Sequence, residues 1–159
     1  MEPGTEPRWL DPEERQTWLA VIKVLLRLPA AFDAQLQRDA DLSLFDYLVM
    51  AALSEAPERT MRLSDIAARA EGTLPRLSQA VSRMEKRGWV RRSPDPNDGR
   101  ATLGTLTDTG YDRLAKAAPG HVESVRRHVF DPLSKHQQRQ FREIARRLTG
   151  TTEPGSHRR

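Results

Sequence analysis

The chain has 159 residues, 37% of them hydrophobic and 30% charged, which is typical of one globular domain, and we expect no second domain of full size. Because the sequence contains no cysteine, disulfides, thiolate metal sites and cysteine-based redox switches are excluded. The formal net charge is only +4, but residues 76–100 hold seven basic and three acidic side chains, so the whole surplus lies in one stretch.

The beginning of the sequence has no pattern typical of secretion or membrane insertion. Residues 1–14 lack the apolar core of a signal peptide. The longest apolar stretch, residues 18–28, contains Lys23 and Arg27 and is far shorter than the about 20 residues that a membrane span needs. We therefore expect a cytoplasmic protein with no membrane partner and a disordered tail over residues 1–10.

A long amphipathic helix is predicted to begin after Asp11. Asp11 is a good N-cap, Pro12 suits the first helical position, and Glu13 and Glu14 lie near the positive end of the helix dipole. Pro29 is expected to kink this helix or split it. Apolar residues at helical spacing cover more than one face, which indicates two packing partners. They are Trp18, Leu19, Ile22, Leu25, Leu26, Leu28, Phe32 and Leu36.

The next three predicted helices follow one another closely. Ser43 is a capping residue for the first of them, which Pro57 ends. A short helix is expected over about Leu63–Ala70, followed by a tight turn and by Thr73, a good N-cap for a helix over Leu74–Arg87. This order of helix, short turn and helix is typical of a helix-turn-helix motif.

The helix predicted over residues 74–87 has two different faces when its residues are placed about 100° apart. The residues of the packing face are Leu74, Leu77, Ala80, Val81 and Met84. The residues of the polar and basic face are Pro75, Arg76, Gln79, Ser82, Arg83 and Lys86. Gly88 follows the helix, where glycine tolerates the left-handed conformation.

Two short strands joined by the turn-rich segment Ser93–Gly99 predict a β-hairpin, in which Gly99 allows a sharp reversal and Arg100 stands at the tip. Thr107 is expected to cap a further helix that ends near Val129 and is interrupted near Pro119. Ser134 caps a last helix, and the tail over residues 150–159 is expected to be disordered. The apolar stripe of the last helix is Phe141, Ile144 and Leu148.

A helix-turn-helix with a basic outer face, followed by a hairpin that carries an arginine, predicts a winged helix that binds double-stranded DNA. An α-helix fits the major groove, where arginine, glutamine and serine contact base edges, and a thin hairpin reaches the backbone or the minor groove. The alternative is an ordinary surface helix with a solvated face, but the charge surplus, the short turn and the hairpin coincide here. The candidate DNA-binding residues are Thr73, Pro75, Arg76, Gln79, Ser82, Arg83, Lys86, Asp98 and Arg100.

Four short motifs stand out between residues 61 and 110. They are LSDIAA at 63–68, SRMEKRGWVRR at 82–92, DPNDGR at 95–100 and LTDTG at 106–110. Together they resemble the MarR-type winged-helix regulators of bacteria, and the order and length of the predicted helices agree with that family over about residues 11–149. The sequence departs from the family where Leu74 and Pro75 replace frequent small hydroxyl residues and where Gly99 replaces a frequent basic residue.

The resemblance implies a mainly α fold with a small β-hairpin wing. It places a winged helix at about residues 43–107 and helices of a dimerisation region at about 11–38 and 108–149. It further implies a homodimer on a palindromic operator, usually a repressor that a small aromatic or anionic ligand releases. The family's Asp-x-Arg pattern maps onto Asp98 and Arg100, which implies that the Asp98 carboxylate orients the Arg100 guanidinium, although aspartate is also common in turns.

Other functions have weaker support in the sequence. A nonspecific architectural protein needs little beyond lysine and arginine, so Gln79 and Ser82 favour base contacts, and a winged-helix module that binds an acidic protein stays open. No Gly-x-Ser-x-Gly, phosphate-binding glycine loop or His-Glu-x-x-His motif occurs, so we expect neither an enzyme nor a cofactor. Trp18 and Tyr47 are either core aromatics or residues of an effector pocket. His121 and His128 are expected to be ordinary helix residues, with no metal site.

Overall fold

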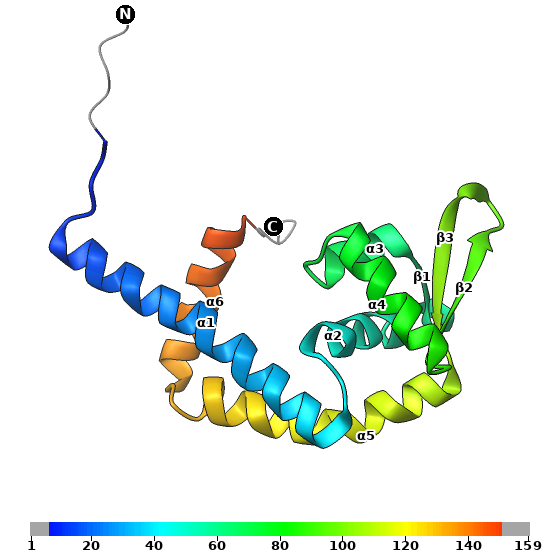
Figure 1. The fold of residues 1–159 in the computed structure, drawn as a ribbon. Helices are drawn as coiled ribbons and strands as arrows, with labels where there is room; N and C mark the ends of the chain where they lie inside the picture. Colours follow the sequence, from blue (N-terminus) through cyan, green and yellow to red (C-terminus); the bar gives the residue numbers. More distant parts are fainter. Residues whose placement is uncertain (1–6, 151–159) are drawn as a thin grey trace, which may run out of the picture.

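The computed structural model describes residues 7–150, and it is mostly helical with a small antiparallel sheet, as the sequence predicts (Figure 1). Its helices are α1 (Pro12–Ala40), α2 (Leu44–Ser54), α3 (Leu63–Arg69), α4 (Leu74–Lys86), α5 (Asp108–Val125) and α6 (Lys135–Thr149). Its strands are β1 (Thr60–Arg62), β2 (Val90–Asp95) and β3 (Asp98–Leu106). A 3₁₀ turn, η1 (Pro57–Arg59), precedes β1, and a π-helical segment, η2 (Arg126–Phe130), follows α5.

The core lies between α2, α3, α4, the base of the sheet and the facing halves of α1 and α5 (Figure 1). Its largest fully buried side chains are Leu36, Leu42, Val49, Met50, Leu53, Ile66, Leu77, Val81 and Met84. The strand order is β1-β3-β2, with both pairs antiparallel. We call the hairpin of β2 and β3 the wing. Because α4 and the wing pack on the same core, their relative positions are fixed.

The helix starts agree closely with the capping residues in the sequence. Each predicted cap side chain accepts a hydrogen bond from a backbone N–H in the first turn of its helix, which satisfies a group that the helix itself leaves unpaired. These caps are Asp11, Ser43, Thr73, Thr107 and Ser134. Gly88 adopts φ +71°, the left-handed conformation expected for the residue that ends α4.

Neither proline divides its helix. Pro29 lies inside α1, which is continuous from Pro12 to Ala40, so the split is wrong and the kink stays a prediction. Pro119 lies inside a continuous α5, so the interruption expected there is wrong. Proline removes one backbone hydrogen bond, but α1 and α5 pack along each other, and tertiary packing outweighs that loss. Gly120 belongs to this contact, since a Cβ there would lie 3.3 Å from Nε2 of Gln35 on α1.

The structure contains one strand that the sequence does not predict, and it describes only a small part of the two predicted tails. The strand β1 has three residues, too few to show an alternating pattern, and it forms by pairing with β3, where Thr60 lies opposite Thr105. The tails predicted at 1–10 and 150–159 fall mainly outside the described residues. Within them, residues 7–10 have no regular secondary structure, and Gly150 caps α6 in a left-handed conformation.

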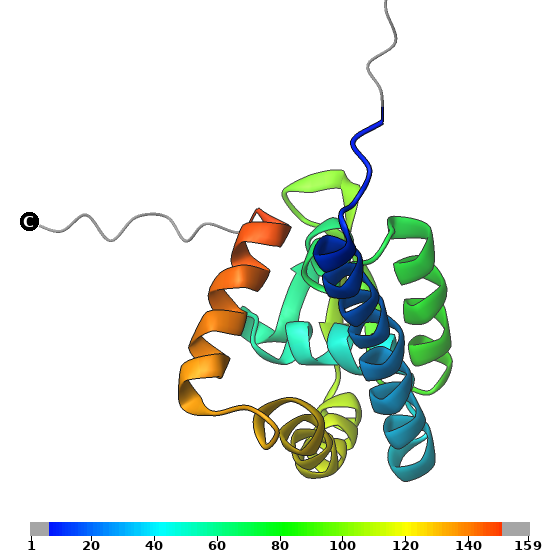
Figure 2. The ribbon, with the colours of Figure 1, turned by 90° about the vertical axis from the view of Figure 1, so that its left-hand side faces the viewer.

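Helix α6 differs from the other long helices because it has no buried residue. Figure 2 shows it as a separate rod at one side of the molecule. The exposed half of α1 is similar, with Trp18, Leu19, Leu25 and Leu26 all largely accessible to water. Both ends of the described chain therefore carry apolar surface that the single chain does not cover.

Candidate nucleic-acid interface

Helix α4 presents the basic face that the sequence predicts. Thr73 caps it, with its Oγ1 accepting a hydrogen bond from the Arg76 backbone N–H at 3.3 Å. The buried residues are Leu77, Ala80, Val81 and Met84. The exposed residues opposite them are Pro75, Arg76, Gln79, Arg83 and Lys86. The one residue assigned to the wrong face is Leu74, which is 52% exposed because the first residue of the helix lies beyond the edge of the core.

Two arginines of this face are held by α2. The guanidinium of Arg76 lies 4.1 Å from the ring centroid of Phe45, a cation-π contact. The Nη2 of Arg83 lies 3.0 Å from a carboxylate oxygen of Asp46. Both arginines remain exposed, so these contacts restrict the rotamers of the two side chains without covering their charge.

Ser82 faces a partner within the protein. Its hydroxyl donates to the Ser78 carbonyl at 2.9 Å and accepts from Nη2 of Arg92 at 2.7 Å. Arg92 also donates from its backbone N–H and from Nε to the Glu85 carboxylate, at 3.0 and 2.8 Å. These hydrogen bonds hold the pKa of Glu85 below its usual range. Ser82, Glu85 and Arg92 therefore fasten the wing strand β2 to α4.

The reversal of the wing differs from the prediction. The turn between the strands is formed by Pro96 and Asn97, so Gly99 and Arg100 are residues of β3 and Arg100 stands beside the tip rather than at it. Gly99 does not have a positive φ. The carboxylate of Asp95 makes the turn by accepting the Asn97 backbone N–H at 2.9 Å, and this bond lowers the pKa of Asp95. The turn therefore depends on the side-chain acceptor of Asp95 and not on the conformational freedom of Gly99.

The expected ion pair between Asp98 and the Arg100 guanidinium is also wrong. The Asp98 carboxylate accepts the backbone N–H of Arg100 at 3.2 Å and lies 3.7 Å from Nη1 of Arg62. Arg62 makes a closer pair with the buried Asp95, at 2.7 Å. The acidic residues of the wing thus bind an arginine from β1, and the guanidinium of Arg100 extends into water.

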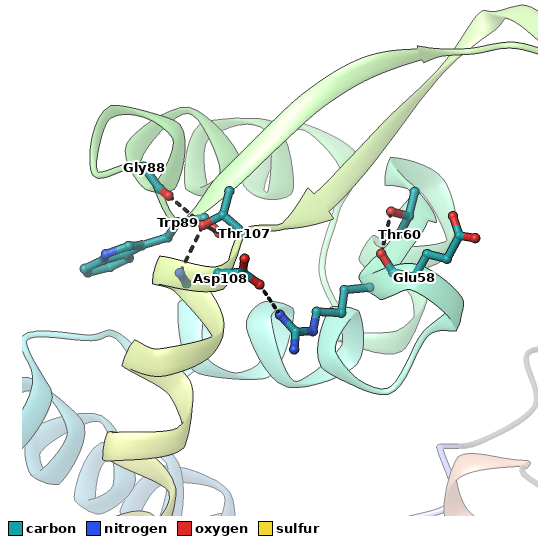
Figure 3. A network of polar contacts seen from close by, with 8 residues as sticks. Glu58, Thr60, Gly88, Trp89, Thr107 and Asp108 are labelled. Atoms are coloured by element: carbon teal, nitrogen blue, oxygen red, sulfur yellow. Dashed lines mark hydrogen bonds and ion pairs between the residues drawn. The ribbon is translucent and has the colours of Figure 1, made fainter.

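The base of the wing is fixed to α5 by Thr107 (Figure 3). Its hydroxyl donates to the carbonyls of Gly88 and Trp89, 2.6 and 3.0 Å away, and accepts the Gly110 backbone N–H at 3.0 Å. Beside it, Nη1 of Arg59 lies 3.0 Å from a carboxylate oxygen of Asp108. The wing, the end of α4 and the start of α5 are therefore held as one unit.

A hollow of about 530 Å³ separates the first turn of α4 from the wing. It is lined by Arg62, Leu63, Ser64, Leu74, Ser78, Arg92, Asp98, Arg100, Ala101 and Thr102. Sequence reasoning included Arg100 but missed Arg62 and Arg92. Arg92 stands seven residues after its partner Glu85, so a strand that folds back along the end of the helix brings the two side chains together. Arg62 contacts residues more than 30 positions away, so no local pattern identifies it.

The two aromatic candidates for an effector pocket lie apart. Trp18 borders a shallow hollow of about 440 Å³ at the start of α1, with Leu10 and Val21. Tyr47 on α2 packs against His121 of α5, with their ring centroids 4.4 Å apart, and burial raises the pKa of Tyr47. The two residues are separated because Trp18 lies about four helical turns before the part of α1 that faces α2.

The histidines of α5 and η2 pack in this same region. His121 and His128 both meet the ring of Phe32 edge to face, at 5.6 and 5.9 Å between centroids. Burial lowers the pKa of His121, so the neutral ring is the packed form.

Across residues 7–150, no helix combines the length and the apolar character needed to cross a lipid bilayer.

Comparisons with known proteins agree with this architecture. A family model for the MarR family matches residues 40–101. The transcriptional regulator HosA of Escherichia coli O111:H- is 34% identical over 109 residues, which are 68% of this chain and 78% of HosA. Sco3205, a MarR family transcriptional regulator from Streptomyces coelicolor solved in complex with DNA, is 43% identical, with a TM-score of 0.89 over 94% of each chain.

A second Streptomyces coelicolor structure gives the same result. AbsC, another MarR family transcriptional regulator, is 34% identical with a TM-score of 0.84, over 91% of this chain and all of AbsC. These relatives are transcriptional regulators, and the two solved structures cover more than nine tenths of this chain. The protein therefore belongs to the MarR family of transcriptional regulators.

Proposed function

We propose that this regulator binds a palindromic DNA operator as a homodimer, with α4 in the major groove and the wing at the adjacent minor groove. The observation that carries the proposal is the arrangement of exposed Arg76 and Gln79 on a helix whose other face is buried, next to a wing fixed in place by Arg92. A helix of this kind addresses base edges with its first turns. The DNA complex of the similar Sco3205 supports the assignment.

The remaining basic residues suit phosphate contacts. Arg83 and Lys86 lie further along α4, away from the end that enters a groove. The strand that runs from the major to the minor groove must cross the gap between α4 and the wing, where Arg62, Arg92 and Arg100 line the hollow. Thr73 adds a capped helix start, whose backbone N–H groups also suit a phosphate. Ser82 and Asp98 position their neighbours in this proposal.

The uncovered surface of the terminal helices supports a homodimer. A groove of about 700 Å³ runs along α6 and η2, with an apolar floor that includes Phe130, Leu133 and Phe141. Ile144 and Leu148 continue this apolar row, and they are 54% and 76% exposed. Exposed apolar surface of this extent marks an interface, and a two-fold dimer matches a palindromic site. Trp18, on the exposed half of α1, is assigned to the same interface.

We propose repression as the mode of regulation, because a dimer on an operator that overlaps a promoter blocks polymerase by occupancy alone. Release by a small-molecule effector is proposed at Tyr47, where α2 meets α5 beside His121. A ligand there contacts the winged helix and a dimer helix together, so it can change the spacing of the two α4 helices. Expression of a reporter behind the operator, with and without the regulator gene, tests repression: higher expression in its presence would contradict it.

Replacing Arg76 or Gln79 by alanine is expected to reduce discrimination between the operator and a scrambled duplex. Each bidentate base contact that is removed should lower the difference in binding free energy between the two duplexes by about 1–3 kcal/mol, because the contact forms with the operator and not with the scrambled duplex. Binding of the full chain to both duplexes is measured by fluorescence anisotropy. Arg83→Ala serves as the control and should weaken binding to both duplexes about equally. An unchanged ratio in the Arg76 and Gln79 variants would show that this face does not contact bases.

Replacing Arg100 by alanine is expected to lower DNA affinity most at low salt and to reduce the slope of log K against log[salt] by about one counterion. The Arg100 guanidinium is exposed and makes no hydrogen bond or ion pair with a side chain within residues 7–150, so it is available to a phosphate or a narrow minor groove. A salt titration compares it with Lys116→Ala, which removes an exposed cation from α5. Equal slopes for wild type and Arg100→Ala would place the wing off the DNA.

A further inference from the structure

Leu74 is an exposed apolar side chain at the end of α4 that faces DNA in the proposed function. It is the first residue of the helix and borders the basic face formed by Arg76 and Gln79. It also lines the hollow between α4 and the wing, together with Ser78 one turn further on. Arg92 and Arg100 line the same hollow. Arg92 is bound by Glu85 and Ser82, but Arg100 is exposed, so a cation that attracts phosphates lies near the leucine. Nucleic acid is therefore the partner that fits over it.

We propose that Leu74 contacts the methyl group of a thymine in the major groove and so specifies one T·A base pair in each half-site. The C5 methyl of thymine is the apolar group that base pairs present on the major-groove edge. The first residues of a recognition helix reach base edges, and a helical side chain leans toward the N-terminus of its own helix. Leu74 therefore points ahead of α4, toward the groove floor.

The chemistry of the leucine side chain favours a methyl group over a polar base edge. Leucine has neither donor nor acceptor, so a guanine or adenine edge placed against it would lose its hydrogen bonds to water without replacement. A thymine methyl loses unfavourable contact with water instead. The inference rests on the proposed function, because it requires α4 to lie in the major groove.

Deoxyuridine tests the contact directly, since uracil lacks only the methyl group of thymine. An operator is first selected from random duplexes, and its thymines are then replaced by deoxyuridine at one symmetric pair of positions at a time. Fluorescence anisotropy with the full chain gives the affinity for each duplex. At one pair of positions we expect an affinity loss of about fourfold for each buried methyl group, or about 15-fold for both half-sites.

The variants of Leu74 assign this effect to the residue. With Leu74→Ala the affinity ratio between thymine and deoxyuridine duplexes at that position should fall to about one, whereas Leu74→Met, which keeps an apolar side chain of similar volume, should retain most of it. Because Leu74 is half exposed at a helix end, neither change threatens folding. Gln79→Ala is the matched control on the same face and should lower operator affinity while it leaves the ratio unchanged.

Two results would overturn the contact: no thymine pair at which deoxyuridine weakens binding, or the same ratio for Leu74→Ala as for the wild type. Either result leaves the proposed function standing if Arg76→Ala and Gln79→Ala still reduce discrimination between the operator and scrambled DNA. If these two variants discriminate as well as the wild type, the proposed base contacts of α4 are wrong. The affinity ratio between thymine and deoxyuridine duplexes for Leu74→Ala tests the methyl contact separately from those base contacts.

Discussion

Replacing Ile144 and Leu148 by glutamate is expected to convert the regulator from a dimer to a monomer and to lower operator affinity by at least about a hundredfold. Both residues belong to the apolar row of α6, a helix that buries none of its residues in the single chain. Carboxylates in that row would have to be desolvated in the dimer. Once separated, each copy binds a single half-site and loses the effective concentration that the joined partner provides, which is worth about 10²–10⁴.

Sedimentation velocity at micromolar concentration and fluorescence anisotropy measure the two effects. The control compares His136→Glu with Leu148→Glu, each of which adds one carboxylate to α6. The two positions lie about 120° apart around the helix, and His136 is exposed and does not line the groove. The His136→Glu variant should stay dimeric with folded α6, since acidic residues suit the first turns of a helix. A dimer that survives the changes at Ile144 and Leu148 would remove α6 from the interface.

Replacing Gly110 by alanine is expected to lower the free energy of unfolding by about 3 kcal/mol, the upper part of the range for overpacking. A Cβ at this position would lie 2.2 Å from the carbonyl oxygen of Trp89 and 2.7 Å from Cδ1 of Leu106. The carbonyl cannot move aside freely, because it accepts hydrogen bonds from both the backbone N–H and the hydroxyl of Thr107 (Figure 3). The substitution thus strains the joint between the wing and α5.

Urea denaturation followed by circular dichroism measures the loss. Gly99→Ala is the matched control, because a Cβ there meets no atom within 4 Å and its φ is not positive. It should change the free energy of unfolding by less than about 0.5 kcal/mol. If Gly110→Ala were as stable as Gly99→Ala, the close approach of α5 to the end of α4 would be refuted.

Local chemistry explains which parts of the fold the sequence predicts. A cap such as Thr73 acts within one helical turn, so four consecutive residues are enough to predict it. The buried side of α4 follows from the helical spacing of its apolar residues. Pro29 and β1 depend on distant partners instead. Pro29 is tolerated because α1 packs against α5, and β1 exists because β3 accepts it as an edge partner.

The candidate interface divides along the same line. The exposure of Arg76 and Gln79 follows from their place on α4, and the sequence predicts both. The roles of Arg62 and Ser82 do not follow, because Arg62 reaches Asp95 across the sheet and Ser82 meets an arginine on the next strand. Side chains from separate elements that pair in the folded protein have no characteristic spacing in the sequence. In this protein such pairs determine which polar groups are available to contact DNA.

Selection of bound duplexes from a random pool tests the central claim most directly, because it requires specific base contacts and two copies of α4 at once. The full chain is incubated with the pool at physiological salt, and the retained duplexes are sequenced after several rounds. A homodimer that reads bases predicts an inverted repeat whose half-sites are centred about one helical turn apart. A pool without enrichment, or a single site without two-fold symmetry, would contradict it.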